Sequence, residues 1–286
     1  MGPKNSLARE TWARFLSNRA AVAGGIFIII LILVAIFADV LFDYDEQVIA
    51  MNMSQRLLPP SAEHVFGTDD FGRDLFVRIC YGTRMSLLVS FSSVFISTVI
   101  GGALGAISGF FGGVVDNVIM RVTDILLAVP MTLFAIVIVA ALGPSTLNLA
   151  IALAASSIPI FARVVRGAVL TVRDNEYVEA ARAIGAGNRV IIFRHILPNC
   201  IPTLIVLFTL NVPSAILTES SLSFLGLGIQ APDASWGLMV NTGRQFLYNA
   251  PWLSLIPSAA IMIIVLAFNF LGDGLRDVLD PHQKNR

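Results

Sequence analysis

Charged residues are scarce in this sequence. Asp, Glu, Lys and Arg make up only 13% of its 286 residues, about half the fraction found in an ordinary soluble domain. Hydrophobic residues make up 56%, and the mean hydropathy is +0.79. This composition excludes a typical soluble domain and predicts a chain that lies largely within a lipid bilayer.

Histidine and cysteine are scarce too, which limits the chemistry open to the chain. The three histidines, His64, His195 and His282, lie outside the long apolar runs. Serine catalysis needs a base, usually histidine, within hydrogen-bond reach, and metal sites need ligands at defined spacings. We therefore expect no catalytic residue, no metal site and no enzymatic activity in this chain.

Two further absences concern nucleotides. The sequence has no G-x-x-x-x-G-K-[ST] segment, the loop that cradles nucleotide phosphates. Its 19 basic residues balance its 19 acidic ones, with no domain-sized basic patch, so no nucleic-acid partner is expected. We therefore expect no cofactor in this chain.

Long apolar runs are what the sequence does contain. A bilayer core about 30 Å thick is crossed by roughly 20 apolar residues in a helix. Six runs of about this length occur, at 20–42, 86–110, 125–142, 147–165, 201–225 and 252–271. Because they are continuously apolar rather than alternating, they predict helices and not barrel strands. The expected fold is all-α and polytopic, with six transmembrane helices.

The basic residues orient these helices, because Lys and Arg concentrate on the cytoplasmic side. Fourteen of the 19 fall on one side: Lys4, Arg9, Arg14, Arg19, Arg121, Arg163, Arg166, Arg173, Arg182, Arg189, Arg194, Arg276, Lys284 and Arg286. The other side holds Arg56, Arg73, Arg78, Arg84 and Arg244. The first run lacks a cleavage site and is taken as a retained span. We expect a cytoplasmic (inner) membrane protein with both termini in the cytoplasm.

Two extracytoplasmic segments follow from this orientation. In the first, residues 43–83, the pattern over 71–84 favours a short interfacial helix with its arginines opposite the apolar face, or else an ordered loop packed on the spans. In the second, residues 226–251, Trp236 and Trp252 fit the outer membrane surface. Whether the second segment is re-entrant stays open.

Small and charged residues inside the spans need a physical reason. Gly101, Gly105 and Gly109 recur every four residues, which favours close approach of another helix over a locally loose helix end. Glu219 lies deep in the fifth run, where a charge is costly. With Asn211 and Ser220 it predicts a wet face on a translocation path; the alternative is a buried carboxyl bonded to hydroxyls.

The segment 174–198 is the most polar stretch between two spans. Asp174 and Asn175 supply an N-cap and Gly185 a stop, so a helix is expected over 175–184. A second helix should begin at Asn188 and end at Pro198. Val178, Ala181 and Ile184 form one stripe of the first helix, and Glu179 pairs with Arg182 on another face. Ala180, Ala181 and Ala183 would expose a small-residue surface that seats closely in a partner's groove.

This segment resembles a known motif. Glu179-Ala180-Ala181, then three residues, Gly185, and nine more residues before His195 and Leu197-Pro198 resemble the EAA loop of permease subunits of binding-protein-dependent ABC importers. The family pattern has isoleucine where this chain has His195. The resemblance implies that Glu179, Ala180, Ala181, Arg182 and Gly185 contact an ATPase subunit.

The resemblance extends beyond the motif. The first span, FGTDDFGRDLFVRICYGTRMSL and SLSFLGLGIQAPDASWG are similar to the C-type permease of dipeptide, oligopeptide and nickel importers. Such a protein would form half of a pathway with a homologous second permease. Its other partners would be two ATP-binding subunits, which hold ATP and Mg, an extracytoplasmic solute-binding protein and the lipid bilayer.

The resemblance also divides the chain. Residues 1–82 would hold a cytoplasmic tail, the first span and the extracytoplasmic loop; 83–281 a five-helix permease core with the coupling loop at 174–198; and 282–286 a cytoplasmic tail. The expected cargo is a di- or oligopeptide, with nickel or glutathione as alternatives. An ion-coupled secondary transporter is a rival function, for which Glu219 is the only intramembrane candidate.

Overall fold

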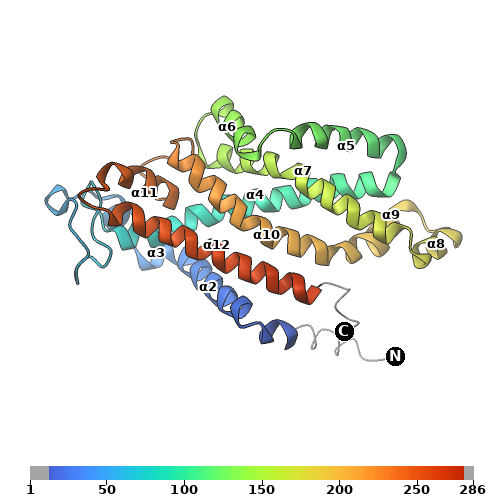
Figure 1. The fold of residues 1–286 in the computed structure, drawn as a ribbon, viewed down its shortest axis with the longest axis horizontal. Coiled ribbons are helices and arrows are strands. Elements are labelled where there is room, and N and C mark those ends of the chain that lie inside the picture. The colour runs from blue at the N-terminus through green and yellow to red at the C-terminus, as the bar shows by residue number, and fades with distance from the viewer. Residues whose placement is uncertain (1–12, 280–286) are drawn as a thin grey trace.

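The computed structural model describes residues 13–279, which form an elongated bundle of helices running roughly along its long axis (Figure 1). The long helices are α2 (Arg19–Ile36), α4 (Leu75–Phe111), α7 (Thr146–Arg173), α10 (Leu197–Phe224) and α12 (Trp252–Leu279). Shorter elements are α3 (Ala38–Leu41), η1 (Tyr44–Ile49), η2 (Met53–Gln55), α5 (Gly113–Leu127), α6 (Met131–Leu142), α8 (Glu176–Ala183), α9 (Asn188–Val190), η3 (Ile191–Ile196), α11 (Trp236–Gly243) and η4 (Arg244–Phe246). Of the predicted cytoplasmic groups, Lys4, Arg9 and the 282–286 tail lie outside the described residues.

The all-α fold predicted from the sequence is confirmed. Five helices within residues 13–279 are long and apolar enough to cross a bilayer, and a bent pair makes up to six. The fifth predicted span is longer than expected, because α9, η3 and α10 run on as one helix over Asn188–Phe224. The chain is therefore a multi-pass membrane protein.

The third predicted span, 125–142, is wrong as a single straight helix. Helix α5 ends at Leu127, α6 begins at Met131, and the two are bent by 88° at the break. Pro130 explains the break, because it has no N–H to donate and its ring disfavours a helical conformation for Val129.

Of the two alternatives for 71–84, neither a separate interfacial helix nor a packed loop over the whole segment is correct, although 75–84 is helical. Helix α4 begins at Leu75 and continues without interruption to Phe111. Arg73 and Arg78 are only 7% and 3% exposed, so they do not form a solvent-facing stripe. The 37 residues of helix α4 span about 55 Å at 1.5 Å per residue, which is well beyond a bilayer core about 30 Å thick.

The glycine spacing on α4 correctly predicted close helix packing. A Cβ atom at Gly101 would lie 2.7 Å from the carbonyl oxygen of Ile158 on α7, and one at Gly105 would lie 2.4 Å from that of Ala162. At Gly109 the nearest atom would be Cβ of Val169, at 2.9 Å. Only residues without a side chain allow the backbones of α4 and α7 to approach this closely.

Polar side chains are buried among apolar ones inside the bundle, and apolar side chains also cover its outside. Four buried serines recur along α4: Ser86, Ser90, Ser93 and Ser97. Ser97 donates to the carbonyl of Ala154 on α7 at 3.0 Å. The outer surfaces of the helices carry large exposed apolar residues such as Ile29, Phe95 and Val118. This distribution is the one expected for helices packed together in lipid.

The predicted surface position of Trp236 is wrong. Its side chain is fully buried, and its indole N–H donates to the carbonyl of Ile79 at 3.1 Å. Helix α11 packs against α10 and α12 at one end of the bundle (Figure 1). The 226–251 segment therefore closes this end with its own buried anchor, which ties it to α4.

Candidate functional site

Helix α8 lies at the end of the molecule opposite α11 (Figure 1). It spans Glu176–Ala183, within one residue of the predicted bounds. Asn175 occupies the N-cap position, but its side chain makes no capping bond. Asp174 instead accepts from Nε of Arg173 at 2.9 Å, which lowers the pKa of this exposed carboxyl.

Gly185 ends α8 as predicted, and its backbone conformation explains why glycine stands there. Its φ of +87° lies in the left-handed region, which other residues adopt only at a cost. Ala186 N–H reaches back to the carbonyl of Ala181 at 3.0 Å, the type of bond that closes a glycine C-terminal motif. The chain is thereby turned toward Asn188 without a long loop.

One face of α8 is buried against the bundle. Val178 and Ala181 are both buried, and Val178 joins a hydrophobic cluster with Val169, Ile191 and Ile196. Two details differ from the prediction. Ile184 lies past the helix end and is 87% exposed, so it is not part of the buried apolar face. Ala181 is on the buried face and not on the exposed small-residue surface.

The outer face of α8 carries Glu179, Ala180 and Arg182, all exposed. Within residues 13–279, Glu179 and Arg182 do not form the predicted ion pair. The Arg182 guanidinium lies over the ring of Phe110 instead, 5.7 Å from its centroid. This contact binds α8 to the end of α4 and leaves the Glu179 carboxylate free of side-chain partners in the described structure.

The second predicted helix of this loop does not end at Pro198. After α9, one π-helical turn, η3, leads directly into α10, and Leu197 N–H bonds to the carbonyl of Ile192, five residues back. The wider turn accommodates Pro198, which has no N–H and whose ring would clash in a regular helix. The 174–198 segment is thus continuous with the α10 span.

Large apolar side chains surround α8 on the surface. Phe193 is 70% exposed, and Val190, Tyr177 and Ile184 are exposed too. Two-residue and four-residue connections join α8 to the neighbouring helices. Exposed apolar groups rimmed by polar residues mark interaction sites. This apolar surface is connected to α7 on one side and, through α9 and η3, to α10 on the other.

The predicted pathway residues lie at different depths of α10. Glu219 is fully buried, and its carboxylate accepts from Ser223 Oγ at 2.8 Å and Ser220 Oγ at 3.3 Å. Ser220 also borders an open groove of about 400 Å³. Asn211 is half-buried and donates to the carbonyl of Leu207 at 2.7 Å. Asn211 precedes Glu219 by eight positions, about 12 Å along a helix, so it does not converge with Glu219 and Ser220.

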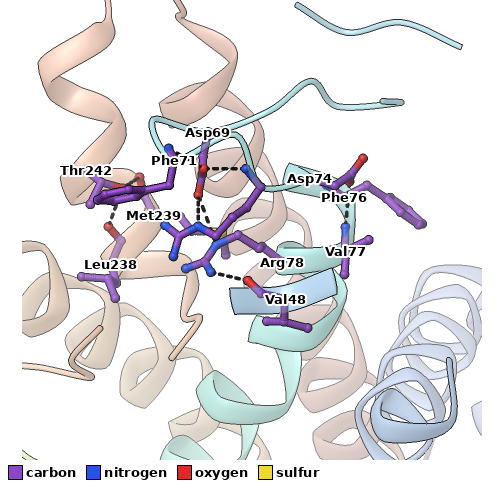
Figure 2. Close-up of polar contacts among 11 residues, drawn as sticks. Val48, Asp69, Phe71, Asp74, Phe76, Val77, Arg78, Leu238, Met239 and Thr242 are labelled. Carbon is purple, nitrogen blue, oxygen red and sulfur yellow. Dashed lines mark hydrogen bonds and ion pairs between the residues drawn. The ribbon is translucent and has the colours of Figure 1, made fainter. Parts of the chain in front are cut away.

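A charged cluster at the α11 end was not predicted from the sequence (Figure 2). Asp69 is at its centre: it accepts from Nε of Arg73 at 2.7 Å and from the backbone N–H groups of Phe71 and Arg73. Arg78 Nε lies 3.5 Å from the same carboxylate, and its Nη1 donates to the carbonyl of Val48 at 2.8 Å. The D-D-x-x-R spacing could have indicated it, since it places Asp69 four residues before Arg73.

Two family profiles match the chain. That of the binding-protein-dependent transport system inner membrane component matches residues 101–285. That of the N-terminal transmembrane domain of oligopeptide transport permease C matches residues 6–60. The first covers the whole of α7 to α12, including the α8 loop.

Curated relatives match almost the full length. The dipeptide transport system permease protein DppC of Alkalihalophilus pseudofirmus is 50% identical, over 97% of this chain and 90% of that protein. The glutathione transport system permease protein GsiD of Pectobacterium atrosepticum is 44% identical, over 97% and 92%. The oligopeptide transport system permease protein OppC of Bacillus subtilis is 43% identical, over 96% and 90%.

A solved structure shares the fold. A chain of the MetNI methionine ABC transporter, in an inward-facing conformation, superposes with a TM-score of 0.57 at 21% identity, covering 69% of this chain and 94% of that one. Together with the matched profiles and the bundle geometry, these relatives establish that the chain belongs to the family of inner membrane components of binding-protein-dependent transport systems.

Proposed function

We propose that this chain forms one half of the translocation pathway of an ATP-driven importer of di- or oligopeptides, with α8 as its ATPase-coupling element. The observation that carries the proposal is the geometry of α8: an exposed Glu179-Ala180 face on a short helix whose other face is fixed to α7 and η3. The names of the dipeptide and oligopeptide relatives support the cargo.

The remaining parts of the machine belong to this proposal. A homologous permease completes the pathway, two ATP-binding subunits hold ATP and Mg, and a solute-binding protein delivers cargo from outside. The chain lies in the cytoplasmic (inner) membrane, and helix α8 and both termini face the cytoplasm. The ATPases alone hydrolyse ATP. Their closure moves α8 as a rigid lever, and differential contact in the two states shifts the spans from inward-open to outward-open.

Substitution Glu179→Arg tests the coupling role. The side chain is exposed, so the free energy of unfolding should change by less than about 0.5 kcal/mol. We expect ATP-dependent dialanine uptake in proteoliposomes to fall at least tenfold and the ATPase subunits to be lost during affinity purification. Glu63→Arg makes the same charge change at an exposed site near the opposite end of the bundle. This control variant should retain the ATPases.

Normal uptake by the Glu179→Arg variant would contradict the coupling role. Uphill transport by the purified chain without any ATPase would contradict the proposal as a whole.

The 44% identity to a glutathione permease favours a second candidate cargo. Glutathione is itself a small peptide, so we propose comparing its uptake with that of dialanine in the same proteoliposomes.

A further inference from the structure

A cavity of about 300 Å³ lies beside the charged cluster at the α11 end of the bundle. Its walls come from three parts of the chain: the segment around 51–78, the segment around 231–242 and the start of α12. The side chains that bear charge are Asp69, Asp70, Arg73 and Arg78, and the apolar wall includes Phe71, Leu238, Met239 and Leu253. Its volume lies at the lower end of the range for small-molecule sites.

Arg78 is the most informative residue of this wall. It is only 3% exposed, yet its Nε has no hydrogen-bond partner in the described structure. The nearest carboxylate, that of Asp69, lies 3.5 Å away and already accepts from Arg73 and two backbone N–H groups. A buried N–H without an acceptor is costly, so Arg78 has a donor available for a ligand in the cavity that it lines. Figure 2 shows Arg78 beside Val48, facing the side of the site formed by Leu238 and Thr242.

Asp70 supplies a charge of the opposite sign. Its side chain is half-buried and accepts from its own backbone N–H. Arg73 and Arg56 attract it electrostatically, but neither forms an ion pair with it within residues 13–279. Burial, and next the neighbouring Asp69 carboxylate, raise the pKa of Asp70. A cation placed beside this carboxylate would relieve both effects.

The four charged side chains of the wall, two acidic and two basic, balance to zero. A ligand with a net charge would leave a buried charge unpaired, which is unfavourable. A zwitterion pairs with both signs and keeps the site neutral. A guanidinium matches a carboxylate well, and a carboxylate such as Asp70 matches an ammonium group.

We propose that this cavity binds a small zwitterion bearing a free ammonium and a free carboxylate, an amino acid or dipeptide. The ligand carboxylate bonds to Arg78, the ammonium group to Asp70, and the ligand side chains contact Leu238 and Met239. That the ligand is the transported cargo rests on the proposed function; the charge pattern alone gives the ligand class.

A purely structural cluster makes a different prediction. Asp69, Arg73 and Arg78 hold the extracytoplasmic segment on α4, and their replacement would disturb the fold under either interpretation. Asp70 forms no ion pair and no hydrogen bond to another residue in the described structure. Asp70→Asn therefore removes the proposed ammonium partner without removing a structural contact, and Leu238→Trp fills the cavity from a half-buried position.

The experiment measures equilibrium binding of radiolabelled dialanine. The tagged full-length chain is purified from its membrane with its accompanying subunits and freed of any extracytoplasmic binding protein. We expect saturable binding, weakened at least tenfold in Asp70→Asn and in Leu238→Trp. Glu63→Gln, which removes an exposed acid of the same segment, should bind within twofold of the unaltered protein. Thermal unfolding of each variant shows that it is folded.

Ligand competition checks the charge pattern. N-acetylalanine lacks the ammonium group and alanine amide lacks the carboxylate, so each should compete at least tenfold more weakly than dialanine. Equal competition by N-acetylalanine would overturn the zwitterion assignment, as would unchanged binding in a folded Asp70→Asn variant or the absence of saturable binding.

ATP-driven dialanine uptake, measured in parallel with the binding protein restored, separates this inference from the proposed function. Uptake without saturable binding to the stripped complex would overturn the site and leave the importer function standing. Binding without uptake would support the site and contradict the peptide cargo.

Discussion

Two neighbouring glycines of α4 differ sharply in what surrounds them. A Cβ at Gly105 would lie 2.4 Å from the backbone oxygen of Ala162, whereas one at Gly102 would lie 3.6 Å from Cδ2 of Leu204, an ordinary contact. Both sit within one turn of the same helix, so the intrinsic gain of about 1 kcal/mol from Gly to Ala is common to both. The comparison isolates the cost of separating α4 from α7.

We expect Gly105→Ala to lower the free energy of unfolding by about 1 to 3 kcal/mol, the usual cost of overpacking, and Gly102→Ala to leave it unchanged or raise it. Thermal unfolding of the two purified variants in detergent measures the difference. Equal stabilities would show that α7 moves aside at no cost and that the glycine stripe does not fix the helix spacing.

At this scale the sequence predicts what depends on local pattern and misses what depends on distant partners. The four-residue spacing of Gly101, Gly105 and Gly109 is visible in the sequence, and so is the close packing that it permits. The burial of Arg78 is not visible, because its environment is built by Asp69 and Val48, which lie outside its own helix. An arginine opposite apolar residues indicates a wet face unless such partners are known.

At the scale of elements, helix ends were predicted well where backbone chemistry marks them and poorly where packing decides. Gly185 ends α8 within a residue of the expected place. Pro198 was taken as a helix end, yet a π turn carries the helix past it. Pro130 is likewise a proline within an apolar run, and there the helix is interrupted between α5 and α6. Nothing adjacent to either proline distinguishes the two cases, because the α5–α7 contacts that stabilise the bend are distant in sequence.

One of these contacts joins α5 to α7. Arg166 donates to both carboxylate oxygens of Asp116, at 2.5 and 2.6 Å, and Ser108 of α4 donates to the same carboxylate. The pair Arg163–Asp124 connects the same two helices, but its side chains are 53% and 60% exposed, against 32% and 16% for Arg166 and Asp116. Water screens the exposed pair more strongly.

Double-mutant cycles to alanine should separate the two pairs. We expect a coupling energy of about 1 to 2 kcal/mol for Asp116 with Arg166, since the pair is bidentate and partly shielded. For Asp124 with Arg163 we expect about 0.5 kcal/mol or less. The energies come from thermal or denaturant unfolding of the four chains of each cycle. Similar values would mean that the bidentate geometry adds nothing to the clamp between α5 and α7.

At the scale of the whole molecule, the two ends of the bundle differ in construction. The α11 end is held by side-chain bonds between distant segments, such as that from Tyr44 to Asp233 at 2.7 Å. Burial, and next this bond, raise the pKa of Tyr44 to about 12. The phenol therefore stays protonated below pH 10, and its bond is lost only as the pH rises through 12. At the α8 end the exposed apolar side chains include Ile184 and Phe193, which lie next to α8 along the chain.

We propose the orientation of these ends in the membrane from charge, since 14 of the 19 basic residues fall on the α8 side of the predicted topology. A membrane-impermeant maleimide tests it. Ile184, next to α8, is 87% exposed, and Tyr248, next to α11, is fully exposed. The two residues therefore lie at opposite ends of the bundle. In intact cells Tyr248→Cys should be labelled at once, and Ile184→Cys only after permeabilisation.

The unaltered chain sets the baseline for this labelling, because Cys80 is half-buried and Cys200 buried. Labelling of Ile184→Cys in intact cells would place α8 outside, out of reach of any cytoplasmic ATPase. The coupling proposal would then be lost together with the orientation, while the packing of α4 on α7 would be unaffected. Orientation is thus the one property on which the role of α8 depends and which its geometry does not supply.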